Sequence, residues 1–291
     1  MKSRRLQPQD PSLHAVALAL LDRAIQSLRH GTDEAAVHTA RKTCKRVRAA
    51  LRLLRDGLGE REYRLDNRRV RDSARPLTAV RDAAMLRRTL GTLSKHSHSL
   101  ARHLEADYHR AWQALDHRGA RNSIARLRAI RARLVKLSRV DSEAASAITG
   151  AKGVYKAGRK ALGKARSRDD LALHEWRKQA KYLLNQLELL RMVFNARFKK
   201  LRRRAGRLAE ALGDDHDLSV LAGKLPAREG QRGSLRKQIK KRRRKLQARA
   251  FRYGKRLYRR SAKHIEATLV AHLSHAQGVS KAANTGVANG D

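Results

Sequence analysis

The sequence predicts an all-α fold of two pseudo-symmetric four-helix bundles related by an internal duplication. Residues with high helix propensity are abundant, and the 291-residue chain holds only 4 prolines and few runs of β-branched residues. The segment 36–45 resembles the segment 172–181, which lies 136 positions later, a distance far too long for a solenoid repeat. We therefore expect two copies of one helical unit within a single chain.

Helix start and stop signals divide each copy into four helical segments. Ser12 can cap the first segment, and either Thr32 or Asp33 can cap the second. Pro76 interrupts the third segment, and Gly213 is expected to break its counterpart in the second copy. The expected segments are residues 12–30, 32–58, 60–93 and 99–137, followed by 142–165, 169–194, 198–212 and 228–272.

These segments are expected to form one domain over residues 12–275, with a first four-helix half at 12–138 and a second at 139–275. The terminal segments 1–11 and 276–291 are polar or rich in small residues, so we expect them to be flexible. No stretch approaches the roughly 20 apolar residues that a membrane span needs, and no signal-peptide core is visible. The sequence therefore predicts a cytoplasmic protein without a membrane span.

An apolar stripe accompanies the repeated basic segment in both copies. It steps by alternating intervals of four and three residues, which is the spacing of a helix packed in a bundle. Its members are Ala40, Cys44, Val47, Leu51, Leu54 and Leu58 in the first copy and Trp176, Ala180, Leu183, Leu187, Leu190 and Phe194 in the second. Because a charge motif alone does not produce two such stripes in register, the duplication extends to the buried side.

Each copy also carries the spacing His-x-x-Arg-Lys-x-x-Lys on the side of its helix opposite the stripe. At about 100° per residue, these cations and two that follow in the first copy share one face. They are His38, Arg41, Lys42, Lys45, Arg48 and Arg52 in the first copy and His174, Arg177, Lys178 and Lys181 in the second. A helix from His38 to Arg55 extends roughly 25 Å, so its row of cations can follow several consecutive phosphates.

The charge balance indicates which anions to consider. Lys and Arg number 69 and Asp and Glu 26, which gives a formal net charge of +43. A protein with this imbalance attracts polyanions, so nucleic acid, an anionic membrane surface and polymeric phosphate are the candidate partners. Hydrophobic residues make up 41% of the chain, enough for a buried core, which excludes a disordered basic tail.

A second repeated element pairs the segment 77–86 with the segment 212–221. The two segments share their first and last Leu and an acidic residue, Asp82 in one and Asp217 in the other. Both acidic residues are expected to follow a helix break, where a carboxylate can cap the next helix or hold a nearby Arg. We expect a structural role for both.

Together these motifs resemble the CHAD domain, an all-α family named for its conserved histidines. The resemblance covers about residues 12–275, and its marks are His38-x-x-Arg41-x-x-x-Lys45-Arg46-x-Arg48, His174-x-x-Arg177-x-x-x-Lys181, Arg81-Asp82 and Leu212-Gly213-x-x-x-Asp217. It implies two pseudo-symmetric four-helix bundles around a basic surface, and binding of inorganic polyphosphate, often at polyphosphate granules. The chain departs from the family pattern at Leu184 and Asn185, where many members carry a larger aromatic or basic pair.

The sequence therefore predicts a polyphosphate-binding module. The alternative ligand is the backbone of nucleic acid, because a phosphodiester suits the same cations. Aromatic residues make up 4% of the chain, so base stacking is disfavoured and duplex DNA is the competitor. His38 and His174 either contact phosphate or orient a neighbouring Arg. Direct contact is expected of Arg41, Lys45, Arg177 and Lys181.

A dense basic run lies near the end of the chain. Residues 236–260 include 14 Lys or Arg and no Asp or Glu. Such a run is usually a solvated face, but one side of it can extend the anion track through Arg244, Arg249, Arg252 and Arg256. No nucleophile with its base, Gly-rich phosphate loop or metal-ligand set is visible, so we expect neither enzymatic activity nor a metal or other cofactor.

Overall fold

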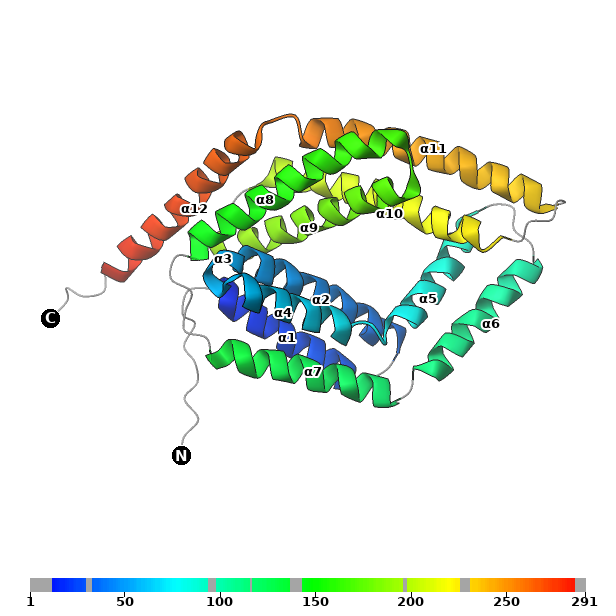
Figure 1. Ribbon diagram of the computed structural model, residues 1–291, viewed down its shortest axis with the longest axis horizontal. Coiled ribbons are helices and arrows are strands. Elements are labelled where there is room, and N and C mark those ends of the chain that lie inside the picture. Colours follow the sequence, from blue (N-terminus) through cyan, green and yellow to red (C-terminus); the bar gives the residue numbers. More distant parts are fainter. Residues whose placement is uncertain are drawn as a thin grey trace.

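The structure is a computed structural model that describes residues 12–29, 33–93, 98–115, 117–136, 143–195, 198–225 and 231–285. It is all-α, as predicted (Figure 1). The first half of the chain contains α1 (Leu13–Arg29), α2 (Glu34–Leu53), α3 (Arg55–Leu58), α4 (Glu60–Ser73), α5 (Thr78–Gly91), α6 (His98–Ala114) and α7 (His117–Lys136). The second half contains α8 (Glu143–Lys164), a 3₁₀ turn (Ala165–Ser167), α9 (Asp170–Phe194), α10 (Lys199–Gly223), α11 (Gln231–Leu257) and α12 (Ala262–Thr285).

The start signals of three helices work as expected. The Ser12 hydroxyl accepts a hydrogen bond from the Ala15 amide at 3.0 Å and caps α1. Asp33 caps α2, since its carboxylate accepts from the amide of Ala36 at 2.7 Å. Asp169 caps α9 in the same way. The alternative cap of α2, Thr32, lies outside the described residues.

Three predicted helix boundaries are wrong, whereas the interruption at Pro76 is confirmed between α4 and α5. The segment 99–137 is two helices, because α6 packs on α5 while α7 returns to α1 and α4. The segment 228–272 divides between α11 and α12, where the buried Tyr155 hydroxyl lies 3.1 Å from the Leu257 carbonyl oxygen and 2.9 Å from that of Arg260. Gly213 breaks nothing, because α10 continues through it to Gly223.

The predicted flexible termini lie mostly outside the described residues. Residues 1–11 and 286–291 are not described. α12 continues to Thr285, so residues 276–285 are helical, and their flexibility stays a prediction. In the part of the chain that the structure describes, every helix is too short or too polar to cross a membrane.

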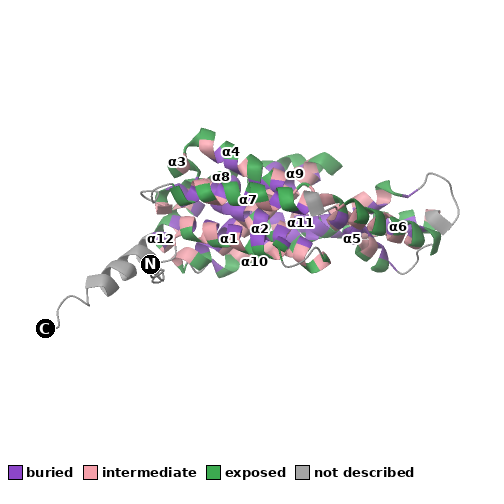
Figure 2. Ribbon diagram, turned by 90° about the horizontal axis from the view of Figure 1, so that it is seen from below, coloured by how far each residue is buried: buried purple, intermediate pink, exposed green. Residues whose placement is uncertain are grey.

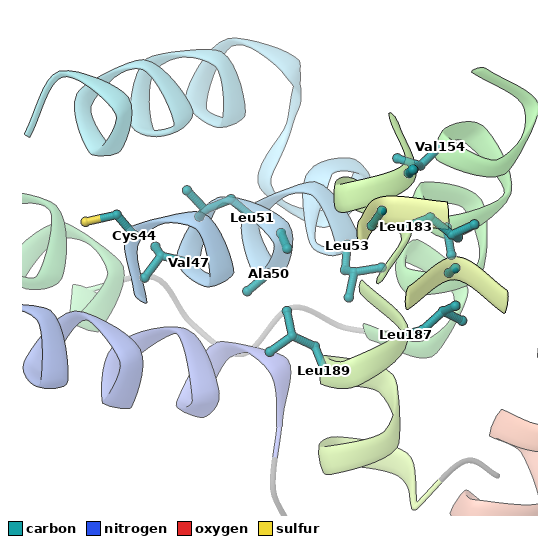
Figure 3. Close-up of a cluster of buried hydrophobic side chains, with 14 of the residues drawn as sticks. Cys44, Val47, Ala50, Leu51, Leu53, Val154, Leu183, Leu187 and Leu189 are labelled. Carbon is teal, nitrogen blue, oxygen red and sulfur yellow. The ribbon is translucent and has the colours of Figure 1, made fainter. Parts of the chain in front are cut away.

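The main core lies where the two halves meet. The stripes of α2 and α9 are buried over most of their length, and side chains from both helices and from α8 meet in one cluster (Figure 3). α1 and α4 pack on α2 and α7 packs on both of them, while α8, α10 and α12 pack around α9 (Figure 1). The two halves therefore share a continuous core.

A second core is assembled from equivalent pieces of both halves. The hairpin of α5 and α6 lies at the end of the molecule away from α12, where it joins the last turns of α10 and the first turns of α11 (Figure 2). Four buried pairs in this core, each separated by 135 positions, are Leu86 with Leu221, Leu90 with Leu225, Leu100 with Leu235 and Leu104 with Ile239. Equivalent residues of the two copies thus pack within one four-helix cluster.

The contact between α8 and α2 supplies a test of the junction between the halves. A Cβ atom on Gly150 would lie 2.5 Å from the Arg52 carbonyl oxygen, whereas one on Gly153 would meet nothing within 4 Å. We expect Gly150→Ala to lower the free energy of unfolding by about 1–3 kcal/mol, because helix backbones cannot separate without disturbing the shared core. Gly153→Ala, the matched control, should raise it by about 0.5–1 kcal/mol through helix propensity. Chemical denaturation compares the two variants, and equal effects would contradict the tight contact.

Candidate anion-binding site

The predicted cationic row of the first copy borders a pocket of about 470 Å³, here named the α2 pocket. It lies between α2 and the junction of α4 with α5. Its lining residues are Arg41, Cys44, Lys45, Arg48, Val70, Arg71, Asp72, Ala74, Arg75 and Thr78. Five of these residues carry a cationic side chain and one is acidic, so the pocket favours an anion.

Pro76 and Arg41 together shape this pocket. Pro76 ends α4 early, which directs the chain away from α2 before α5 begins. Arg41 then bridges the gap by donating from Nη1 to the Ala74 carbonyl oxygen at 2.9 Å and to the Thr78 hydroxyl at 2.7 Å. Its buried Nε has no hydrogen-bond partner among the described residues. Arg41 is therefore part of the scaffold and also retains an unused donor.

Lys45 and Arg48 line the pocket beside Arg41. Arg48 is fixed by donation from its Nε to the Asn67 side-chain oxygen at 2.9 Å. Lys45 remains accessible to solvent, but surrounding protein atoms and the nearby cations Lys181 and Arg41 lower its pKa to about 8. Burial is the largest cause of this shift, because a charged ammonium loses hydration there. The ammonium of Lys45 is thus a destabilised cation that an anion would stabilise.

The equivalent cations of α9 converge on the same region. Burial also lowers the pKa of Lys181 to about 8, and the charges of Arg177 and Arg81 add to the effect. Lys45 is affected by the charges of Lys181, Arg81 and Arg177, so α2, α5 and α9 each direct positive charge into one neighbourhood. Such mutual repulsion is unfavourable without a counter-ion.

Arg177 repeats the arrangement of Arg41. Both side chains are half-buried, and in each the Nε is buried without a hydrogen-bond partner among the residues that the structure describes. Asp217 offsets the charge of Arg177, as Asp82 does for Arg41. Both acidic residues were expected to follow a helix break, which is wrong for Asp217, because it lies within α10 and caps no helix. Their structural role stays a prediction.

Two histidines adjoin this neighbourhood in the second copy. The Nδ1 atoms of His174 and His216 lie 3.5 Å apart, and the rings pack with their centroids 4.8 Å apart. Burial, with the charges of Arg177 and His174, lowers the pKa of His216 to about 4. The pKa of His174 is also lowered, mainly by burial and then by Arg177. The ligand-free protein therefore holds this pair neutral at pH 7.

The two copies differ where the pocket forms. Three of the five cations of the α2 pocket are replaced in the second copy by an apolar residue, a glycine and an acidic residue. Counted by the sequence offsets of the repeats, Arg48 corresponds to Leu184, Arg71 to Gly206 and Arg75 to Glu210. A Cβ on Gly206 would lie 3.9 Å from the Leu184 side chain, and one on Gly213 would lie 3.8 Å from Lys181 Nζ. The continuous α10 therefore packs closely on α9, where α4 and α5 diverge from α2.

Four residues of the predicted rows are placed differently from the pocket cations. His38 and Lys42 are exposed at the start of α2, outside the pocket lining. The Arg52 guanidinium stacks 3.8 Å from the centre of the Tyr182 ring and borders another pocket. Lys178 pairs with Glu175 at 2.6 Å. Their roles in ligand binding stay predictions.

The predicted track along the last basic run is divided between surfaces. Arg244 lines a pocket between α10 and α11, while Arg249 borders a hollow that also contains Asp214. Arg252 lies 5.8 Å from the Tyr253 ring centre, and Arg256 is exposed in the last turn of α11. None of these four residues lines the α2 pocket, and their part in an anion track stays a prediction.

Arg71 and Arg75 belong to the pocket, although sequence reasoning did not select them. Both are exposed, with Arg71 in the last turn of α4 and Arg75 in the turn just before Pro76. The Pro76 break was the available signal, because the pocket forms where the chain leaves α4. Within the described part of the chain, no group of three or more His, Cys, Asp or Glu side chains is arranged to hold a metal ion.

Comparison with known proteins agrees with this fold. The CHAD domain family model matches residues 13–226, so the chain belongs to the CHAD domain family. The structure is similar to the crystal structure of the CHAD domain from the plant Ricinus communis, with a TM-score of 0.56 and 19% identity. That similarity covers 92% of this chain and 95% of that chain, and it shows the shared fold. Among curated proteins, no significant match to the chain is found.

The lowered pKa values of Lys45 and Lys181 predict how the stability of the ligand-free protein depends on pH. Both values fall from 10.5 to about 8. Below pH 8 both lysines are protonated in the folded and unfolded states, so the folded state bears the full electrostatic cost of holding both charged ammonium groups. Between about pH 8 and 10 the unfolded chain binds more protons, and stability rises with pH.

Chemical denaturation at several pH values measures this effect. The free energy of unfolding of the wild type should rise relative to that of a Lys45→Gln, Lys181→Gln variant as the pH increases from 8 to 10. Parallel pH profiles would contradict the shifted pKa values, because other titrating groups are common to both proteins.

Proposed function

We propose that the protein binds inorganic polyphosphate through the α2 pocket and the adjoining cations of α9. The observation that carries this proposal is the convergence of Arg41, Lys45 and Arg48 with Arg71 and Arg75 around one pocket. Arg offers planar donors to phosphate oxygens, and Lys adds a mobile charge. The resemblance of the repeated motifs to the CHAD family implies the same ligand.

The unused donors support an anion as the ligand. The Nε atoms of Arg41 and Arg177 are buried without a hydrogen-bond partner among the described residues, and such a state is costly unless a ligand or water supplies an acceptor. A phosphate oxygen supplies both an acceptor and negative charge. The low pKa values of Lys45 and Lys181 support the same conclusion, because an adjacent phosphate would favour their protonated forms.

A chain of phosphates suits this arrangement better than one phosphate. The cations of the α2 pocket come from three turns of α2 and from the end of α4, and those of α9 lie beside Lys45. Seven residues separate Arg41 from Arg48, a rise of about 10 Å along the helix. Successive phosphates of a flexible chain can meet successive cations, and each contact releases counterions.

We propose binding, rather than catalysis, as the role of this site. The Nδ1 atoms of His174 and His216 lie 3.5 Å apart, and burial raises the pKa of the Cys44 thiol to about 11. A raised pKa opposes formation of the nucleophilic thiolate. Such a protein would reside in the cytoplasm at polyphosphate granules.

The first experiment compares polyphosphate with duplex DNA, the alternative ligand. A thin chain can enter a recessed pocket that a wide duplex touches only at the rim. At equal phosphate concentration and about 0.15 M salt, where screening acts over about 8 Å, polyphosphate should therefore bind more tightly. Competition measured by fluorescence anisotropy with labelled polyphosphate tests this. Tighter binding of DNA would favour the nucleic-acid alternative.

The second experiment tests the site with two exposed cations. Lys45→Gln combined with Arg75→Gln removes two charges from the α2 pocket and leaves the bonds of Arg41 intact. The affinity for polyphosphate should fall by about tenfold or more, and the slope of log affinity against log salt should decrease by about 1–2.

The matched control for the second experiment removes equal charge elsewhere. Lys241→Gln with Lys245→Gln changes two exposed lysines of α11 that lie outside the lining of the α2 pocket. This control should alter affinity by about twofold at 0.15 M salt, because screening weakens distant charges. If both double variants lose affinity equally, bulk charge accounts for binding and the site assignment is wrong.

A further inference from the structure

A second cationic pocket lies between α10 and α11, near the start of α9, and is here named the α11 pocket. It has a volume of about 650 Å³ and shares none of its lining residues with the α2 pocket. Ala222 and the buried Ile239 supply its apolar surface, and Arg168 borders it from the turn before α9. No acidic side chain is among the described residues that line it.

The cations of this pocket form a ladder along α11. Arg236, Lys240 and Arg244 follow one another at intervals of four residues, which places them on one side of the helix. Eight residues span about 12 Å of helix, a length that one phosphate cannot cover and a short chain of phosphates can. Arg168 adds charge at one side of the ladder, and Arg243, which pairs with Asp170 and Asp215, forms part of the wall.

Arg243 is positioned by two carboxylates, the buried Asp215 and the exposed Asp170. Its Nε donates to Asp215 at 3.0 Å, its Nη2 contacts Asp170, and Asp215 also accepts from the Gln247 amide at 3.1 Å. Asp215 is only 2% exposed, so this network fixes the guanidinium in the pocket wall. The remaining cations are on the exposed side, where a ligand can reach them.

Arg168 ends the 3₁₀ turn before α9 and lines the pocket. Its backbone is left-handed, with φ 57° and ψ 17°, a conformation that costs most residues energy and that glycine adopts freely. The only other described residue besides glycine with positive φ is Asn195, a residue type that tolerates it well. Strained backbone of this kind often occurs at binding sites, and here it presents a long cationic side chain to the pocket.

We propose that the α11 pocket is a separate binding site for a triphosphate group, either inorganic tripolyphosphate or the triphosphate of a nucleotide. The ladder of Arg236, Lys240 and Arg244 binds the phosphates along α11, and Arg168 closes one side. Ile239 and Ala222 provide an apolar surface against which a nucleoside can lie. This site does not depend on the proposed function of the α2 pocket.

Calorimetric titration in a background that carries Lys45→Gln and Arg75→Gln tests the site separately from the α2 pocket. Tripolyphosphate and ATP are titrated separately at matched ionic strength. Adding Lys240→Gln and Arg244→Gln should reduce affinity by about tenfold or more, whereas adding the exposed pair Lys241→Gln and Lys245→Gln should change it by about twofold. Equal losses in the two variants, or no measurable binding in the background protein, would overturn the proposal.

The two phosphate sources are distinguished within the same titrations. Equal affinities indicate that the triphosphate alone is recognised, and tighter binding of ATP indicates contact with its nucleoside. Binding of tripolyphosphate alone assigns the site to inorganic phosphate chains. Each of these outcomes supports a triphosphate site. If the Lys240 and Arg244 changes leave the affinities for both ligands unaltered, the site is excluded.

Substitutions of Arg168 separate binding from folding. Arg168→Gln and Arg168→Gly both remove the charge, so both should lower triphosphate affinity by about tenfold. Only glycine relieves the left-handed backbone, so the melting temperature of Arg168→Gly should exceed that of Arg168→Gln by about 2 °C. Unchanged affinity in both variants would exclude Arg168 from the site. If Arg168 had only a structural role, Arg168→Gly would not lose affinity while gaining stability.

Discussion

The packing of α2 against α9 is the constraint on which the rest of the structure depends. It buries the two apolar stripes in one core, and it also brings Lys45 near Lys181, a like-charge approach that adds to the effect of burial in lowering the pKa of Lys45. Burial of each large apolar side chain contributes about 1.5–3 kcal/mol, so a shared stripe can outweigh charge repulsion on its opposite side. The cationic site therefore exists because the core beneath it holds the cations together.

The two copies differ because α4 and α5 pack on α2 in one way and α10 packs on α9 in another. Pro76 separates α4 from α5 and leaves room for the α2 pocket, whereas the continuous α10 packs on α9 with Gly206 and Gly213 at the contact. An unbroken α10 also extends into the second core and carries Asp215 to Arg243. One copy thus provides an open pocket, and the other provides a rigid support.

Sequence periodicity predicted the features that depend on a single helix. The stripes, the cationic rows and the caps at Ser12 and Asp33 follow from local spacing and local hydrogen bonds. The break between α6 and α7 did not, because it carries no proline and is set by the different packing partners of the two helices. The α2 pocket was only half predicted, since Arg71 and Arg75 reach it through a turn whose direction depends on tertiary packing.

Placement of the few acidic residues explains how so basic a chain folds and still retains free positive charge. Several carboxylates are used inside the scaffold: Asp66 is fully buried against Arg133, Glu143 accepts from the first amides of α1, and Asp215 holds Arg243. These bonds tie together helices that are distant in sequence, where low dielectric strengthens each interaction. Arg71 and Arg243 pair with acidic side chains, but other cations that line the two pockets make no ion pair among the described residues and keep their charge for a ligand. These cations include Lys45, Arg75, Lys240 and Arg244. Because these structural carboxylates lie apart from many of the exposed cations, the chain can fold and still present an anion-binding surface.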